Sequence, residues 1–284
     1  MISLLDLFDQ YRLPMDVWIR DGVNWLVMNA RPFFLAAREP VAIMLNWFDE
    51  GLNAIPPLIF LAGAGALAWF SNGWKLAAGT VGGFLVIGFL GLWGMTMTTL
   101  AMTLTAVTFC ILVGVPIGTF AAQSNRFERS LMPVLDAMQT TPTFVYLVPI
   151  VMLFGIGNVP SVLATIIVAL PPMIRLTSLG IREVDPEIIE AGRAFGCTRF
   201  QILREIQIPL AMPTIMTGLN QALMLSLSMV VVAALIGAGG LGLSVYSGIN
   251  RLDVGLAGIA GLAIVALAII LDRIVRGFAS GGKQ

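Results

Sequence analysis

Histidine is absent from the 284-residue chain, and Lys75 and Lys283 are its only lysines. Without histidine the chain cannot build His-based zinc sites, the metalloprotease motif or a Ser-His-Asp triad. Two lysines leave little material for a Ser-Lys dyad. The sequence therefore predicts no catalytic centre and no metal site, and we do not expect this chain to be an enzyme.

Cysteine and charged residues are also scarce. The two cysteines are Cys110, inside an apolar segment, and Cys197, inside a polar one, so no disulfide framework is expected. Charged residues make up 11% of the chain, the formal net charge is zero, and no basic stripe is present. Nucleic acid is therefore not an expected partner.

The rest of the composition is strongly apolar. Apolar residues make up 58% of the sequence and the mean hydropathy is +0.92, which predicts an all-α integral membrane protein in contact with lipid. Segments of near-bilayer length predict about seven transmembrane helices at roughly 20 residues each, the first being the shortest. These segments are 55–70, 76–93, 97–121, 133–154, 159–179, 213–236 and 254–275.

The arginines predict the orientation, because short cytoplasmic loops are rich in Lys and Arg. Basic residues follow the third span, fill the polar segment 182–209 and follow the seventh span. The connections at the opposite ends carry little charge. We therefore expect the N-terminus outside, and a cytoplasmic tail over residues 277–284 after a transmembrane domain spanning 55–276.

Residues 1–54 fit neither a span nor a soluble domain. Asp16, Arg20 and Asn24 share one helical face, with Trp18 and Trp25 on the other. This pattern, and a second one over 41–53, predicts amphipathic helices in the outer membrane interface. They either brace the bundle or dock a specific partner.

The segment 182–209 is polar although it lies between apolar spans. Residues 182–205 hold nine ionisable side chains, and burying them at mid-bilayer would cost on the order of 20 kcal/mol or more. The segment is therefore expected in water. Asp185-Pro186 predicts a helix start, Gly196 a stop, and Thr198 with Gln201 a capping box. Such a hairpin either meets a partner or packs on its own bundle.

The fourth predicted span is the most polar and the best candidate for a translocation pathway. Prolines within spans free backbone carbonyls, which lipid tolerates only where protein or a water-filled cavity satisfies them. The alternative is a set of packed kinks. The candidate pathway residues are Gln139, Thr140, Thr141, Pro142 and Tyr146.

Two further features have competing interpretations. Asp136 and Arg175 are ionisable residues inside predicted spans, where they either anchor the structure by pairing or snorkelling, or serve transport.

The run 237–242 matches G-x-G-x-x-G, but it follows an apolar span instead of a strand, which excludes a dinucleotide site. Its glycines, Gly237, Gly239, Gly240 and Gly242, form either an outer gate or a plain turn.

Part of the polar segment resembles the cytoplasmic signature of transmembrane permease subunits of ABC importers, E-A-A, three residues, G, nine residues, I-x-L-P. The matching residues are Glu190, Ala191, Gly196, Ile206 and Pro209. Gly192 replaces the second Ala and Ile208 the Leu, and Gly192 is expected to add backbone freedom. Segments 136–142, 146–158 and 211–216 resemble the ProW-type permeases of glycine betaine/proline betaine uptake systems, a likeness that extends from about Arg31 onward.

The resemblance implies a bundle like that of type I ABC importer permeases, in the cytoplasmic (inner) membrane of a bacterium. Two permease copies would form a homodimeric pathway, with two cytoplasmic ABC ATPase subunits that bind ATP and Mg and a periplasmic or tethered substrate-binding protein. The cargo would be a quaternary ammonium osmolyte such as glycine betaine, proline betaine or choline. Residues 190–196 would be the coupling helix that docks into the ATPase, and Pro209 would end the second short helix.

A different class of transporter is the alternative. An ion- or proton-coupled secondary carrier would place ionisable residues near mid-bilayer and often show inverted repeats. Neither feature is evident in the sequence.

Overall fold

The computed structural model describes residues 14–279, and every regular element in that range is a helix. The predictions for residues 1–13 and 280–284 fall outside the described part of the chain. The long helices are α2 (Met15–Ala54), α3 (Pro57–Phe89), α4 (Trp93–Gln123), α7 (Asn158–Arg182), α10 (Ile208–Ala234) and α12 (Val254–Ala279). The shorter elements are α5 (Asn125–Thr140), α6 (Thr143–Phe154), α8 (Pro186–Ala194), α9 (Arg199–Gln201), the π-helical turn η1 (Ile202–Gln207) and α11 (Leu241–Asn250).

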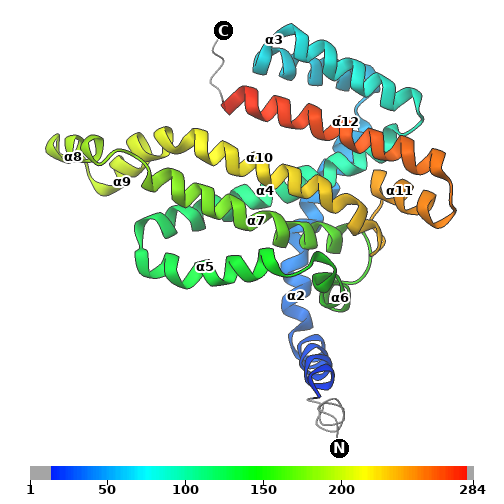
Figure 1. Cartoon of the computed structure of the whole chain (residues 1–284), viewed down its shortest axis with the longest axis horizontal. Coiled ribbons are helices and arrows are strands. Elements are labelled where there is room, and N and C mark those ends of the chain that lie inside the picture. Colours follow the sequence, from blue (N-terminus) through cyan, green and yellow to red (C-terminus); the bar gives the residue numbers. More distant parts are fainter. Residues whose placement is uncertain (1–13, 280–284) are drawn as a thin grey trace, which may run out of the picture.

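Helices α4, α7 and α10 form the centre of the bundle and lie side by side (Figure 1). Glycines set their spacing. A Cβ on Gly118 of α4 would lie 2.6 Å from the Cβ of Thr177 in α7, and one on Gly180 of α7 would lie 2.8 Å from the Cβ of Thr214 in α10. Close backbone approach at small residues is how helices associate in lipid, where burial from water adds no driving force. The three helices therefore form one tightly packed slab.

Helices α3, α11 and α12 cover one side of this slab (Figure 1). Their apolar contact is built around Phe84, Leu100 and Leu267, all buried. Helix α3 consists of two helical arms joined at a kink, and the arms correspond to the first two predicted spans, 55–70 and 76–93. The arms fold back on one another, because the rings of Phe60 and Phe84 lie 5.0 Å apart. The kink lies at Asn72 and Gly73, and the Gly73 φ of 79° is one that glycine adopts without strain.

Helix α2 differs from the expected pair of short helices, because it is continuous through Pro32 and Pro40. It runs across the direction of the central helices (Figure 1) and makes an angle of 109° with α3. Its C-terminal half buries Val41 and Leu45 against α4 and α7, whereas Trp18 in the other half is exposed. The packed half braces the bundle, and the interfacial position of the other half stays a prediction.

The fourth predicted span, 133–154, is not one straight helix. Helices α5 and α6 meet at 97° across Thr141 and Pro142, where the Thr141 backbone is extended. A residue that precedes proline is pushed out of the helical region, which explains the break. By length and composition, residues 14–279 contain four membrane-spanning helices, or up to six if each bent pair counts as one span. This count takes α3 as one element, and counting its two arms separately brings the upper number to the seven predicted spans.

The two ends of the bundle differ in the way that the arginine pattern predicts. The α4–α5 turn and the segment α8–α9 lie at one end, and the connections before α7 and after α10 lie at the other (Figure 1). The basic loops therefore group together. That this end faces the cytoplasm stays a prediction.

Candidate functional site

The polar segment 182–209 forms a helical hairpin that projects from one end of the bundle (Figure 1). Its first helix, α8, starts as predicted. The Asp185 side chain accepts a hydrogen bond of 2.9 Å from the backbone N–H of Glu187, and Pro186 occupies the first helical position. Both features satisfy or remove backbone donors that a helix start leaves unpaired.

The hairpin turns at Gly196, as the sequence predicts. Gly196 has a φ of +81°, its N–H donates to the Arg193 carbonyl at 2.9 Å, and the Cys197 N–H donates to the Gly192 carbonyl at 3.1 Å. This is a left-handed helix stop that favours glycine. No atom lies within 4 Å of the point where a Gly196 Cβ would stand. Backbone conformation, not lack of space, therefore demands glycine here.

The second short helix starts with the predicted capping box. The Thr198 N–H donates to the Gln201 side-chain oxygen at 2.8 Å, and the Gln201 N–H donates to the Thr198 hydroxyl at 3.3 Å. The two residues thus satisfy one another's backbone donors. The local sequence signals at 185, 196 and 198 are all confirmed.

Gly192 has a role that differs from the expected gain in backbone freedom. It is buried inside α8, and a Cβ there would lie 2.8 Å from the Cδ1 of Ile206 in η1. The missing side chain lets Ile206 pack onto the backbone of α8. Two signature residues therefore join the two arms of the hairpin, and Gly192 tightens the hairpin instead of loosening it.

The predicted helix end at Pro209 is wrong. The chain is helical from Arg199 through Ala234 without a stop, and Pro209 lies in the first turn of α10. Proline lacks an N–H and its ring crowds the carbonyl four residues earlier. The wider π-helical turn η1 ends at Gln207, two positions before Pro209, and it includes the carbonyl four residues before the proline that the ring would crowd. The hairpin is thus continuous with a central helix.

Apolar side chains on this hairpin point away from the bundle. Phe195 is 89% exposed and Phe200 is 66% exposed, whereas Leu203 and Ile206 are partly buried. In the sequence, Phe200, Leu203 and Ile206 recur at helical spacing, which predicts one apolar stripe, whereas no pattern marks Phe195. Glu190 and Ala191 are exposed on α8. Beside them, Ile189, Arg193, Arg199 and Phe200 help line a cleft of about 460 Å³.

The predicted pathway residues lie together at the α5–α6 break. The hydroxyl groups of Thr140 and Thr141 donate to carbonyls four residues earlier, at 2.9 and 2.7 Å. The Tyr146 hydroxyl donates to the Met138 carbonyl at 2.5 Å. The Tyr146 hydroxyl thus satisfies a carbonyl that the break leaves free, because Pro142 has no N–H to donate to Met138, while Gln139 and Pro142 are exposed. Their role in a pathway stays a prediction.

The glycine run 237–242 lies at the opposite end, packed tightly against its neighbours. The Gly239 N–H donates to the Asn158 side-chain oxygen at 2.7 Å, and the Leu241 N–H donates to the Thr99 hydroxyl at 2.8 Å. A Cβ on Gly240 would collide with Thr99, and one on Gly242 with the Val230 carbonyl. In this structure the run is therefore closely packed where α4, α7 and α10 meet. Whether it opens as a gate stays a prediction.

Comparison with known proteins decides the family. Residues 114–281, which include the α5–α6 break, the hairpin and the glycine run, match the family described as "Binding-protein-dependent transport system inner membrane component". The chain belongs to this family. It is an inner membrane component of a transport system.

Relatives of the same family cover almost the whole chain. The glycine betaine/proline betaine transport system permease protein ProW of Escherichia coli (strain K12) is 51% identical over 96% of this chain and 77% of ProW. The glycine betaine transport system permease protein OpuAB of Bacillus subtilis (strain 168) is 46% identical over 93% of this chain and 94% of OpuAB. The similarity therefore includes α2 as well as the family region.

The fold resembles that of a solved transporter. A chain of the MetNI methionine ABC transporter, in an inward-facing conformation, superposes with a TM-score of 0.60 at 21% identity. The match covers 66% of this chain and 93% of that chain. The expected type I permease-like bundle is confirmed.

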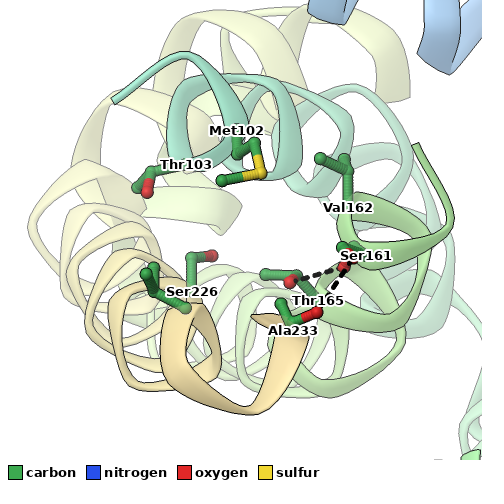
Figure 2. A pocket seen from close by; sticks show the side chains of 8 residues that line it. Met102, Thr103, Ser161, Val162, Thr165, Ser226 and Ala233 are labelled. Carbon is green, nitrogen blue, oxygen red and sulfur yellow. Dashed lines mark hydrogen bonds between the residues drawn. The ribbon is translucent and has the colours of Figure 1, made fainter. Parts of the chain in front are cut away.

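The family comparison leaves one polar feature of this permease without a role, a small cavity at the centre of the slab (Figure 2). Thr103, Ser161, Thr165 and Ser226 line it from α4, α7 and α10, and its volume is about 10 Å³. Each hydroxyl donates to its own helix backbone, so its oxygen remains free to accept. The space is about the size of one water. No sequence pattern reveals this site, because its hydroxyls are scattered through apolar spans.

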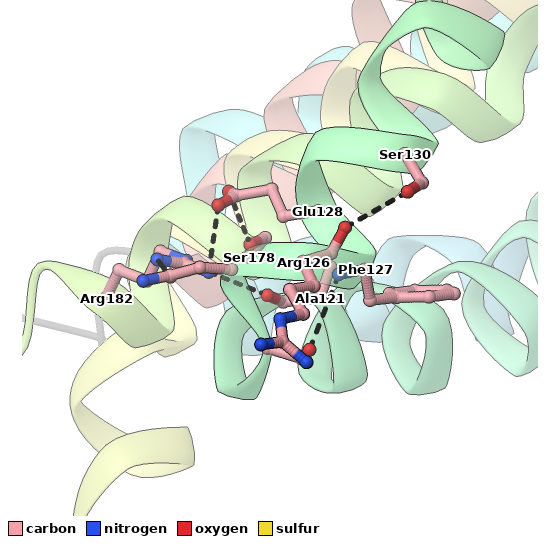
Figure 3. A network of polar contacts seen from close by, with 9 residues as sticks. Ala121, Arg126, Phe127, Glu128, Ser130, Ser178 and Arg182 are labelled. Atoms are coloured by element: carbon pink, nitrogen blue, oxygen red, sulfur yellow. Dashed lines mark hydrogen bonds and ion pairs between the residues drawn. The ribbon is translucent and has the colours of Figure 1, made fainter.

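A second missed feature is an ion-pair network at the base of the hairpin (Figure 3). Arg182, the last residue of α7, lies 2.8 Å from a carboxylate oxygen of Glu128 in α5. It also donates to the Asn125 side-chain oxygen at 2.7 Å and to the Ala121 carbonyl at 2.8 Å. One arginine therefore joins the ends of α4, α5 and α7. Fifty-four positions separate Glu128 from Arg182, so no local pattern reveals the pair.

Proposed function

We propose that this chain is the membrane-spanning, non-catalytic subunit of an ATP-driven importer of a quaternary ammonium osmolyte, with glycine betaine as the first substrate to test. The hairpin carries the proposal, because Phe195 and Phe200 are exposed at a charged end of a membrane protein, next to a cleft of about 460 Å³. Exposed aromatics beside a cleft are typical of a protein interface. The names of the ProW and OpuAB relatives support the substrate.

The proposed assembly follows from this division of labour. Two copies of the chain form the pathway. Two cytoplasmic ATPase subunits bind ATP and Mg and contact the hairpins, and a substrate-binding protein delivers the osmolyte on the outer side. The N-terminus is then external and the C-terminus cytoplasmic. Because the hairpin continues into α10 and follows directly from α7, closure of the ATPase pair would move both helices together.

The energy source is tested in vesicles. The permease, purified with its ATPase and binding protein, is placed in liposomes with labelled glycine betaine outside and ATP inside. We expect uptake that requires ATP and continues after a protonophore removes the proton gradient. Uptake driven by an ion or proton gradient without ATP would contradict the proposal and favour a secondary carrier.

The pathway is tested by cysteine labelling at the α5–α6 break. In a Cys197→Ser background, we expect Thr141→Cys and Gln139→Cys to react with a small charged thiol reagent in at least one nucleotide state. Val148→Cys in α6 is the control, because its side chain is exposed and apolar, as expected at a lipid face. Equal inertness of all three positions in every state would show that the break is not lumenal.

A further inference from the structure

Helix α5 is weakly attached to the rest of the chain by apolar contacts. Among the described residues of α5, only Leu135 is fully buried. Helices α4, α7 and α10, in contrast, interlock through glycines such as Gly118 and Gly180. Polar contacts must therefore contribute much of what positions α5 against the slab.

Two ion pairs make these contacts, both with α7. Glu128 pairs with Arg182 at 2.8 Å near the start of α5, and Asp136 pairs with Arg175 at 2.6 Å further along it. The partners are spaced by eight residues on α5 and seven on α7, each about two helical turns, or roughly 11 Å. Between the two pairs, the Ser178 hydroxyl donates to Glu128 at 3.4 Å. The two antiparallel helices are thus held in register over two turns.

The two pairs differ in their surroundings. The side chains of Glu128 and Arg182 are 23% and 30% exposed, and Arg182 is held by two further hydrogen bonds, one to α4 and one to the first residue of α5. Asp136 is 63% exposed, so its pair with Arg175 is more open to screening. The Glu128–Arg182 pair is therefore the stronger tie, and the Asp136–Arg175 pair fixes the register.

We propose that these ion pairs make α5 follow α7 when the hairpin moves, and so connect the ATPase-facing hairpin to the α5–α6 break. Arg182 lies three positions before Asp185, where α8 is capped, and Asp136 lies five positions before Thr141, where α5 ends. The path from hairpin to break thus runs through α7, the two pairs and α5. Glu128, Arg182, Asp136 and Arg175 act as positioning residues for transport. This inference rests on the proposed function.

The test is the coupling ratio, the number of osmolyte molecules taken up per ATP hydrolysed in proteoliposomes. Glu128→Gln combined with Asp136→Asn removes both charges on α5 with little change in shape. We expect this variant to lose about tenfold in the ratio, because coupling between sites is typically worth factors of that order, while the ATPase still co-purifies. A ratio equal to that of the native chain would overturn the inference.

Charge reversal separates a positioning role from a merely structural one. Asp136→Arg alone places two like charges together and should lower the ratio, whereas Asp136→Arg with Arg175→Asp restores an ion pair with the opposite polarity. We expect the double reversal to recover at least half of the native ratio. Failure of the reversal to recover any coupling would count against the inference.

A distance measurement keeps the inference testable if a variant fails to fold. Spin labels at Arg129 of α5 and Leu179 of α7, in a Cys197→Ser chain, report the spacing of the two helices in the assembled transporter. We expect one distance in the nucleotide-free and ATP-bound states. A change between these states would show that α5 does not follow α7. Absence of ATP-dependent uptake by the native complex would instead reject the proposed function itself.

Discussion

Replacing both Phe195 and Phe200 by alanine is expected to weaken binding of the ATPase subunit at least a hundredfold. Large aromatic side chains that become buried at the centre of an interface often contribute 2 kcal/mol or more each. The two side chains are 89% and 66% exposed in the isolated chain, so removing them leaves its own packing almost unchanged. The loss should therefore appear in binding and transport and not in folding.

The measurement is the affinity of the detergent-solubilised permease for its purified ATPase, with thermal unfolding of the permease recorded in parallel. Phe278→Ala is the matched control, because Phe278 is 49% exposed near the end of α12 and outside the hairpin. We expect the control to bind normally. Normal binding by the double alanine variant would show that the ATPase grips another surface, and the docking assignment would be abandoned.

The hairpin shows which features a sequence can predict. The start at Asp185, the turn at Gly196 and the capping box at Thr198 were all predicted correctly, because each depends on hydrogen bonds within a few residues. The Gly192–Ile206 contact and the helix continuing through Pro209 depend on how the second arm folds back. Residue preferences alone cannot reveal such contacts.

The bundle shows the same division between local and long-range information. Hydropathy locates the apolar segments and correctly predicts the two arms of α3, but it does not show that 133–154 bends by 97°. Because apolar content is similar on both sides of a bend, a hydropathy average over a sequence window does not detect the bend. The pairing of Asp136 with Arg175, one of the two sequence-based interpretations, is confirmed, and both residues lie near the same ends of adjacent spans. The Glu128–Arg182 pair required the structure.

Replacing Gly196 by valine is expected to reduce transport more than any other single change in the hairpin. A β-branched residue at a φ of +81° costs about 1–2 kcal/mol or more, because the left-handed region crowds its Cβ against the backbone. The chain would relieve this strain by leaving the left-handed conformation, which changes the angle between α8 and α9. Phe195 and Phe200 lie on either side of the turn and would lose their relative positions. We expect transport to fall by at least tenfold, with membrane insertion intact.

Gly196→Asn is the control that isolates the backbone effect. Asparagine adds a side chain of about the same size as valine but tolerates the left-handed region, and the space around the missing Cβ is open. ATP-dependent uptake and ATPase co-purification are measured for both variants, and we expect asparagine to retain most of both. If the two substitutions reduce uptake equally, bulk at the partner surface matters more than the turn. If neither substitution reduces uptake, the hairpin does not transmit the ATPase cycle, because transmission as a rigid unit requires a fixed angle between α8 and α9.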